Sequence, residues 1–229
     1  MKGYGKSRLR RTMLLLPGNN ANMINQAARY GADSIVFDLE DSVTAAEKDA
    51  ARQLVKYALQ FLPFRCETAV RINHVTQTPF GIDDLLAILP SKPNLIVLPK
   101  TESAGEVRLV TAMIEEAEQQ HGFAPGSIRM MCAIESERGL RKVGAIAKEP
   151  RVAALALGGE GELDVHHARS RIAMAARESG IQAIDAIYPD VYNLEGFRRE
   201  TAAGKDLGFS GTAIVHPLQI DIVHELYQP

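Results

Sequence analysis

Charged side chains stand at the ends of several short apolar runs, where they could carry out chemistry. They are Glu40, Asp41, Arg71, Lys100, Glu135 and Glu160. Carboxylates bind hard cations such as Mg2+ and transfer protons, whereas an arginine presents paired donors to a carboxylate or an enolate oxygen. If the apolar runs are the strands of a parallel barrel, their carboxyl ends meet on one face and these residues share one mouth. This arrangement indicates an enzyme.

The segment DLED at residues 38–41 crowds three acids into four positions. Their repulsion favours either a solvated surface turn or a nearby cation, which can be a metal ion or an arginine. Because the segment ends the apolar run SIVFDLED, we expect at least one carboxylate to point into the mouth. Arg71 is the natural partner, since an arginine inside an apolar run is costly unless it is paired. It either pairs only with Glu40 or Asp41, or it also holds a substrate carboxylate or a developing enolate oxygen.

Glu135 closes the very apolar run IRMMCAIES and is a candidate metal ligand or catalytic carboxylate. A hard cation such as Mg2+ takes oxygen ligands, usually one or two carboxylates completed by water and substrate oxygens. Lys100 either contacts the substrate or pairs with Glu102. Gly158 and Gly159 have no side chains, which lets a ligand come close to the backbone. We therefore expect both glycines to line the substrate site.

The elements that must position these residues follow a regular order. The apolar runs begin at residues 12, 34, 68, 94, 128, 152, 182 and 211. Amphipathic helical patterns cover 21–30, 45–61, 104–120, 166–179 and 194–207. Continuous apolar runs are typical of strands buried on both faces, so we expect one α/β domain, a (β/α)8 TIM barrel over residues 1–229. An open doubly wound sheet is the alternative, but no G-x-G-x-x-G fingerprint follows the first run.

Composition excludes several other classes of protein. The net charge of -2, the pI near 6.3 and the absence of Trp give no reason to expect nucleic acid as a partner. No apolar stretch approaches the ~20 residues of a membrane helix, and no signal peptide is visible, so we expect a cytoplasmic protein. Cys66 and Cys132 are expected to be reduced thiols. The basic head is either a solvated tail or brings Arg10 or Arg11 to a phosphate of a cofactor such as coenzyme A.

Segments along nearly the whole chain, taken in order, resemble the citrate lyase beta-subunit-like family of acyl-CoA lyases. The matching pieces are RRTMLLLPGNN from residue 10, GADSIVFDLEDSV from 31, EKDAAR from 47, RIN from 71, LPKTES from 98, AIES from 133, GGE from 158, RSRI from 169, IQAID from 181 and VHPLQI from 215. The resemblance implies a TIM barrel, assembled as a homotrimer or hexamer, that uses Mg2+ to cleave a 3-hydroxyacyl-CoA into acetyl-CoA and a 2-oxo acid.

The resemblance also assigns roles to the residues of the mouth. It implies that Arg71 contacts the substrate, that Glu135 binds the metal, and that Glu40 and Asp41 brace the site. In this family, the glycine-glycine-glutamate element found here at 158–160 is common in relatives that act on free CoA thioesters. Citramalyl-CoA, which gives pyruvate and acetyl-CoA, is therefore the expected substrate.

The sequence departs from the family pattern in two places. Gly161 stands where the family has an aspartate as second metal ligand, and a loop of about a dozen residues, a length typical of functional loops, is missing there. We interpret this loop as omitted from the sequence rather than deleted from the protein, because the residues on both sides keep the pattern. The sequence also stops at Pro229, whereas the family continues into a C-terminal segment that covers a neighbouring subunit's site and supplies an acid.

Three other functions stay open. The chain could be a citrate lyase beta subunit that converts a citryl thioester to oxaloacetate. It could be a metal-dependent aldolase that acts on 2-oxo acids without CoA. The replaced metal ligand also leaves room for a non-catalytic CoA-binding subunit.

Overall fold

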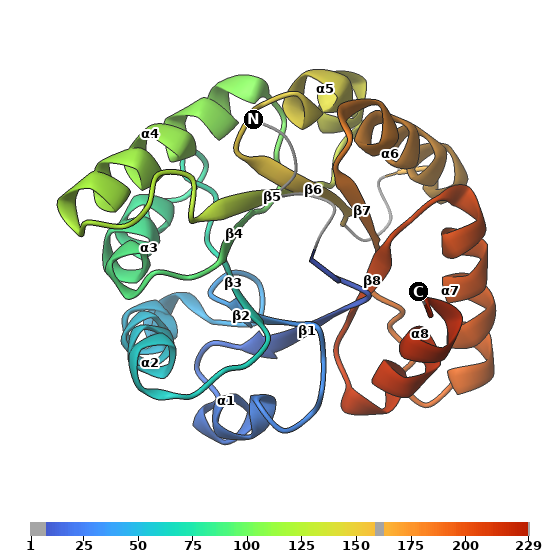
Figure 1. Cartoon of the computed structure of the whole chain (residues 1–229), viewed down its shortest axis with the longest axis horizontal. Helices are drawn as coiled ribbons and strands as arrows, with labels where there is room; N and C mark the ends of the chain where they lie inside the picture. The colour runs from blue at the N-terminus through green and yellow to red at the C-terminus, as the bar shows by residue number, and fades with distance from the viewer. Residues whose placement is uncertain (1–7, 159–162, 229) are drawn as a thin grey trace.

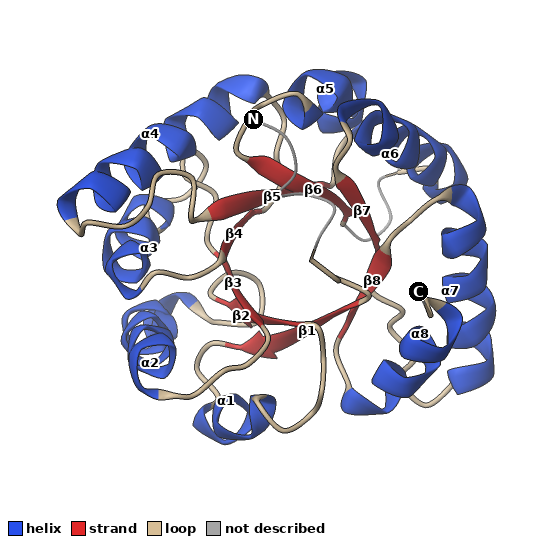
Figure 2. Cartoon of the chain, viewed as in Figure 1, coloured by secondary structure: helices blue, strands red, loops and turns tan. Residues whose placement is uncertain are grey.

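Eight parallel strands close into a barrel in chain order in the computed structural model, which describes residues 8–158 and 163–228. The strands form the inner ring and the helices surround it (Figures 1 and 2). The last strand pairs with the first, with Thr12 opposite Thr212, so the sheet has no open edge. The predicted (β/α)8 TIM barrel is confirmed, and the doubly wound alternative is wrong.

Strands and helices alternate along the chain. The strands are β1 (Thr12–Pro17), β2 (Ser34–Asp38), β3 (Glu67–Arg71), β4 (Leu95–Leu98), β5 (Arg129–Ile134), β6 (Val152–Leu157), β7 (Gln182–Asp185) and β8 (Gly211–Ile214). The helices are α1 (Ala21–Ala27), η1 (Ala45–Glu47), α2 (Lys48–Phe61), α3 (Gly81–Ile88), η2 (Leu89–Ser91), α4 (Ala104–Gln120), α5 (Glu137–Ala147), α6 (Val165–Ser179), α7 (Leu194–Leu207), η3 (Pro217–Gln219) and α8 (Ile220–Leu226).

The helix ends follow from local chemistry. Ser103 begins α4 with a capping box, in which its side chain accepts from the Glu106 amide while the Glu106 carboxylate accepts from the cap. Gly180 and Gly208 end α6 and α7 in the left-handed conformation that glycine adopts readily. The predicted helical segments coincide with α1, with η1 and α2, and with α4, α6 and α7. The structure also contains helices α3 and α5, which the sequence analysis did not predict. Helix α3 is short, and two glycines weaken the amphipathic pattern of α5.

Two cores hold the barrel together. A large outer cluster, which includes Leu14, Ile35 and Val70, joins the strands to the helices around them. A smaller inner cluster fills the barrel axis with side chains from alternate strand positions, apart from the consecutive pair Ala153 and Ala154 in β6. Its members are Met13, Val36, Ala69, Leu95, Val97, Met131, Ala133, Ala153, Ala154, Ala156 and Ile184.

The strand alternation decides which residues face the axis at the carboxyl ends. Side chains two positions apart on a strand point to the same face. Four residues lie two positions after a member of the inner cluster. They are Asp38 after Val36, Arg71 after Ala69, Glu135 after Ala133 and Gly158 after Ala156. These four positions therefore face the mouth, at the end of the barrel where the parallel strands finish.

Two features of the structure bear on the compartment: the state of the cysteines and the character of the helices. Both cysteines, Cys66 and Cys132, are free, and burial raises the pKa of the Cys132 thiol to about 12. No helix in the described ranges has the length and apolar character needed to cross a membrane.

Candidate active site

Arg71 at the end of β3 is held by Asp38 at the end of β2. The two residues are neighbours in the strand register. Arg71 Nε donates to Asp38 Oδ1 over 2.7 Å, and Nη2 donates to Oδ2 over 2.8 Å. Asp38 is 2% exposed, so this bidentate pair is nearly dry. The sequence predicted Glu40 or Asp41 as the partner of Arg71. That assignment is incomplete, because Glu40 and Asp41 form only longer ion pairs with Arg71, whereas the strand alternation turns Asp38 directly toward the arginine.

The third nitrogen of Arg71 faces the other acids at longer range. Nη1 lies 3.4 Å from Glu40 Oε2 and 3.6 Å from Asp41 Oδ2. Neither approach has the geometry of a hydrogen bond, and Glu40 Oε2 is buried without a hydrogen-bond partner among the described residues. The Arg71 side chain is 17% exposed, which leaves this end of the guanidinium open to the mouth. Arg71 thus has donors that an anionic group can use.

Lys100 closes the acidic side of the mouth. Its Nζ donates to Glu40 Oε1 over 2.6 Å and to Asp41 Oδ1 over 3.2 Å. The alternative pairing with Glu102 is wrong, because the Glu102 carboxylate accepts from Ser136 Oγ over 2.7 Å. Lys100 has a φ of 46°, a left-handed conformation that is uncommon for a residue with a side chain. Such strain is typical of sites where geometry serves function.

The strained backbone of Lys100 also reaches Glu135 at the end of β5. The Lys100 amide donates to Glu135 Oε1 over 3.0 Å. Across from it, a Cβ added to Gly158 would lie 3.0 Å from Glu135 Cγ and 3.2 Å from Oε1. Gly158 therefore leaves the space that the Glu135 carboxylate occupies, rather than only giving a ligand access to the backbone. The structure thus brings Arg71, Glu40, Lys100 and Glu135 together with Asp41 and Gly158, as the sequence predicted.

Charge and burial tune the acids differently. Burial acts to raise the pKa of Asp38, but hydrogen bonds and charge from Arg71 prevail and hold it below its ordinary value. Burial raises the pKa of Glu40 to about 7, despite the hydrogen bond from Lys100 and the charge of Arg71. The pKa of the Arg71 guanidinium is raised above its ordinary value, because its bonds to Asp38 outweigh its desolvation. One acid is therefore fixed as a carboxylate, whereas Glu40 can gain or lose a proton near neutral pH.

The donor set suits a hard cation held largely by water and substrate. Within the described ranges, no three Asp, Glu, His or Cys side chains form a metal-binding group. Glu135 offers one carboxylate at a strand end, and its Oε2 accepts no hydrogen bond from described residues. Mg2+ is commonly bound by one or two carboxylates, with water and substrate oxygens completing its shell. Glu135 fits that role, whereas a site closed by protein ligands alone does not fit these residues.

Two groups of predicted residues are not among the described residues of the mouth. Gly159 and Glu160, with Gly161 after them, fall outside the described residues. Arg11 precedes β1 at the opposite end of the barrel, where its Nε and Nη2 each donate to the Asp33 carboxylate over 2.8 Å. The structure therefore does not bring Arg11 to the mouth. The strand order could have shown this, because residues before a strand lie away from the carboxyl ends.

Comparisons with known proteins agree with this geometry. The family model described as HpcH/HpaI aldolase/citrate lyase matches residues 11–217. Citrate lyase subunit beta of Escherichia coli (strain K12) is 40% identical over 238 residues, covering 98% of this chain and 78% of that protein. A (3S)-malyl-CoA thioesterase of Cereibacter sphaeroides (strain ATCC 17025) is 30% identical over 232 residues, covering 96% and 77%.

Solved structures of one further protein are also similar. The citrate lyase beta subunit of Mycobacterium tuberculosis with oxaloacetate and magnesium superposes with a TM-score of 0.79 at 29% identity, covering 97% of this chain and 98% of that one. The same organism's CitE in complex with magnesium, acetoacetate and coenzyme A has a TM-score of 0.75 at 28% identity, covering 96% and 82%.

Proposed function

The chain belongs to the HpcH/HpaI aldolase/citrate lyase family and is thereby a carbon–carbon lyase, and we propose that it cleaves a 3-hydroxyacyl thioester into an acetyl thioester and a 2-oxo acid with the help of Mg2+. The observation that carries this proposal is the open end of Arg71, which is fixed by Asp38 yet keeps unbonded donors beside Glu40. A saturated structural ion pair would leave no such donors.

The substrate is best sought among thioesters of hydroxylated di- and tricarboxylic acids. The identity of 40% to a citrate lyase subunit, against 30% to a malyl-CoA thioesterase, favours a citryl thioester that yields oxaloacetate. The M. tuberculosis complexes contain magnesium together with oxaloacetate or coenzyme A, which supports both the ion and the thioester. Citramalyl-CoA, expected from the glycine-glycine-glutamate element, is the second substrate to test.

Arg71 stabilises the negative charge that develops on the thioester oxygen when the carbon–carbon bond breaks. The hydroxyl group passes its proton to a base and becomes the carbonyl of the 2-oxo acid, as the bond between the carbinol carbon and the thioester α-carbon breaks. The electron pair of that bond forms the thioester enolate, and an acid then protonates its carbon to give the acetyl thioester. The Nη1 group of Arg71 can donate hydrogen bonds to the enolate oxygen, and donors aimed at such an oxyanion lower the barrier strongly. Asp38 fixes the guanidinium, so little reorganisation is needed as the charge appears.

Glu40 and Glu135 take complementary roles. Glu40 has a pKa of about 7 and one buried oxygen without a partner among the described residues, which suits the transfer of a proton to or from the reacting atoms. Lys100 holds Glu40 in place, because its Nζ donates to both Glu40 and Asp41. Glu135 would hold Mg2+, which supplies Lewis-acid polarisation of the hydroxyl and carboxylate of the departing 2-oxo acid half. Gly158 keeps the space for that carboxylate.

Incubation with three thioesters tests this function. Citryl-CoA, citramalyl-CoA and malyl-CoA are each supplied with Mg2+, and oxaloacetate, pyruvate or glyoxylate is measured together with acetyl-CoA. We expect citryl-CoA to be cleaved fastest, EDTA to stop the reaction and Mg2+ to restore it. Cleavage of free 2-oxo acid aldols in place of thioesters would support the aldolase instead. No turnover, together with no Mg2+ binding by calorimetry, would support the non-catalytic subunit.

The family resemblance also leads us to propose a homo-oligomer, a trimer or hexamer. Light scattering coupled to size-exclusion chromatography measures the mass of the particle directly. A particle with the mass of one 25.0 kDa chain would contradict this assembly.

A further inference from the structure

A buried lysine lies directly behind the acidic turn of the mouth. Lys48 is the first residue of α2 and is 6% exposed. Its Nζ donates to two main-chain carbonyls, those of Leu39 and Glu40, each over 2.6 Å. In the described part of the chain it forms no ion pair with a carboxylate. An ammonium group has three donors, and here two of them hold the backbone between Asp38 and Asp41.

The place of Lys48 is unfavourable by local rules. Helix N-termini carry partial positive charge and favour acids, so a cation in the first turn is destabilising there. Burial lowers the pKa of Lys48 below its ordinary value, although the nearby acids Asp84, Asp38 and Glu40 act to raise it. A residue that breaks local rules and is desolvated as well is usually retained for the geometry it imposes.

A second group fixes the same turn from the neighbouring strand. Asn73, just after β3, donates from Nδ2 to the Leu39 carbonyl over 2.8 Å and to Asp84 Oδ2 over 2.7 Å. Asp84 in turn accepts from Arg52 Nε over 2.9 Å. Lys48 and Arg52 are four residues apart and therefore lie on one face of α2. The inner face of this helix thus holds the turn through the Leu39 carbonyl, which accepts two hydrogen bonds.

We propose that Lys48 is a positioning residue, which holds the backbone of residues 38–41 so that the Glu40 carboxylate and Arg71 face the substrate correctly. The inference rests on the proposed function for its catalytic meaning. The Leu39 carbonyl lies between the Asp38 and Glu40 side chains, and the Glu40 carbonyl lies between those of Glu40 and Asp41. A shift of either carbonyl therefore reorients the acids on both sides of it. Three acids within four residues repel one another, and their turn needs an anchor of this kind.

The charged groups around Glu40 determine how the loss of Lys48 would affect the titration of the Glu40 carboxylate. Lys100 donates to Glu40 from the end of β4, Arg71 faces it from β3, and Asp41 is its neighbour in the turn. None of these three groups contacts Lys48 directly, whereas Lys48 binds the carbonyl of Glu40 itself. Loss of Lys48 therefore removes one cation near Glu40 and leaves the other three groups in place.

The test compares Lys48→Met with Lys48→Arg and with Lys56→Met, a control on the same helix outside the mouth. We expect Lys48→Met to lower kcat about 10–100-fold per folded molecule, with KM changed less than about 3-fold, because small misplacements of catalytic groups have effects of this size. Lys48→Arg keeps the charge and two donors and should recover most of kcat, and Lys56→Met should behave as the parent protein. If Lys48→Met does not fold, Lys48→Gln replaces it.

A measurement without substrate separates this inference from the proposed function. The titration of the Glu40 carboxyl carbon is followed by 13C NMR in the parent protein and in each variant. Loss of the Lys48 cation should move that titration to higher pH, and Lys48→Arg should move it back. A titration shift without turnover of any thioester would refute the function and keep the positioning role. An unchanged titration, or a kcat unchanged per folded molecule, would overturn the role of Lys48.

Discussion

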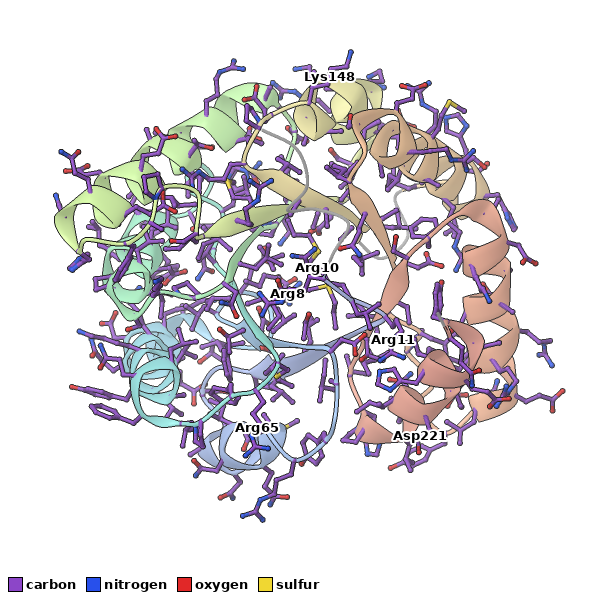
Figure 3. The ribbon with its side chains drawn as sticks, viewed as in Figure 1. Arg8, Arg10, Arg11, Arg65, Lys148 and Asp221 are labelled. Atoms are coloured by element: carbon purple, nitrogen blue, oxygen red, sulfur yellow. The ribbon has the colours of Figure 1, made fainter. Side chains whose placement is uncertain are left out.

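Bidentate arginine–carboxylate pairs occupy both ends of this barrel, and they differ in what each leaves unbonded. At the amino end, Arg10 donates from Nε and Nη2 to Glu67 over 2.6 and 2.8 Å, and from Nη1 to Gln182 over 2.5 Å. Figure 3 shows Arg10 within the ring of strands, with Arg11 toward β8. At the carboxyl end, Arg71 uses only two of its three nitrogens on Asp38.

The difference separates a structural end from a reactive one. Arg10 is 3% exposed and every nitrogen of its guanidinium is bonded, so its pair closes the barrel floor. The mouth instead combines an Arg71 Nη1 that forms ion pairs but no hydrogen bond with described residues, the left-handed backbone of Lys100 and a Glu40 whose pKa is about 7. In TIM barrels the amino end commonly supports stability and the carboxyl end catalysis. The same pair of residue types therefore serves opposite purposes according to its unused donors.

Arg10→Met should have the largest effect, and on stability alone. It leaves the buried Glu67 with only a longer ion pair to the half-exposed Arg8 at 3.5 Å and the hydrogen bond that Ser34 Oγ donates over 2.9 Å. Breaking one side of a buried pair costs about 3–5 kcal/mol in the free energy of unfolding, which urea denaturation measures. The double variant Arg10→Met with Glu67→Met should regain much of that loss. A fall in kcat per folded molecule would contradict the division between the two ends.

Arg71→Lys should have the next largest effect, and on turnover. The ammonium keeps the charge but cannot hold Asp38 with two bonds and still present a third nitrogen to the enolate. Loss of one oxyanion donor lowers kcat by about 10²–10³-fold, equivalent to about 2.7–4 kcal/mol. Steady-state kinetics with the best thioester measures this loss, and circular dichroism checks the fold. Turnover close to that of the parent protein would remove Arg71 from the mechanism.

Glu40→Gln should show a smaller effect, which depends on pH. The pKa of Glu40 is about 7 in the folded protein, against an ordinary 4.5. Between these values the folded protein holds a proton that the unfolded chain has released, so the free energy of unfolding falls as pH rises. Glutamine has no such proton, and the variant should lose less stability over this interval, by on the order of 2 kcal/mol. Equal pH slopes for the two proteins would mean that burial does not perturb Glu40.

Sequence reasoning could find the fold and most of the mouth, because both depend on position along the strands. Continuous apolar runs with polar ends predicted the barrel, and they placed Glu135 and Arg71 at its carboxyl end. They could not choose among Asp38, Glu40 and Asp41 as the partner of Arg71. That choice depends on strand register, which sets Asp38 opposite Arg71. Counting the alternation back from Asp38 to Val36 could have favoured it.

The buried support of the mouth was harder to predict, because it acts through main-chain atoms. Lys48 binds the carbonyls of Leu39 and Glu40, and carbonyl groups carry no signature in the sequence. Asn73 likewise reaches the Leu39 carbonyl from the next strand. A lysine in the first turn of an expected helix is itself a departure from helix rules, and that departure was the available signal.

Arg11 gives the smallest expected effect and the sharpest test of the division between the ends. The sequence left open that it meets a phosphate of coenzyme A, but the Arg11 guanidinium, just before β1, is held by Asp33, just before β2 and away from the mouth. Arg11→Gln removes a partly exposed ion pair and should cost on the order of 1 kcal/mol of stability. The KM for a CoA thioester should change less than about 2-fold, because no mouth residue contacts Arg11. A KM raised 10-fold or more would place part of the substrate at the amino end, and the two ends of the barrel would then no longer have separate roles.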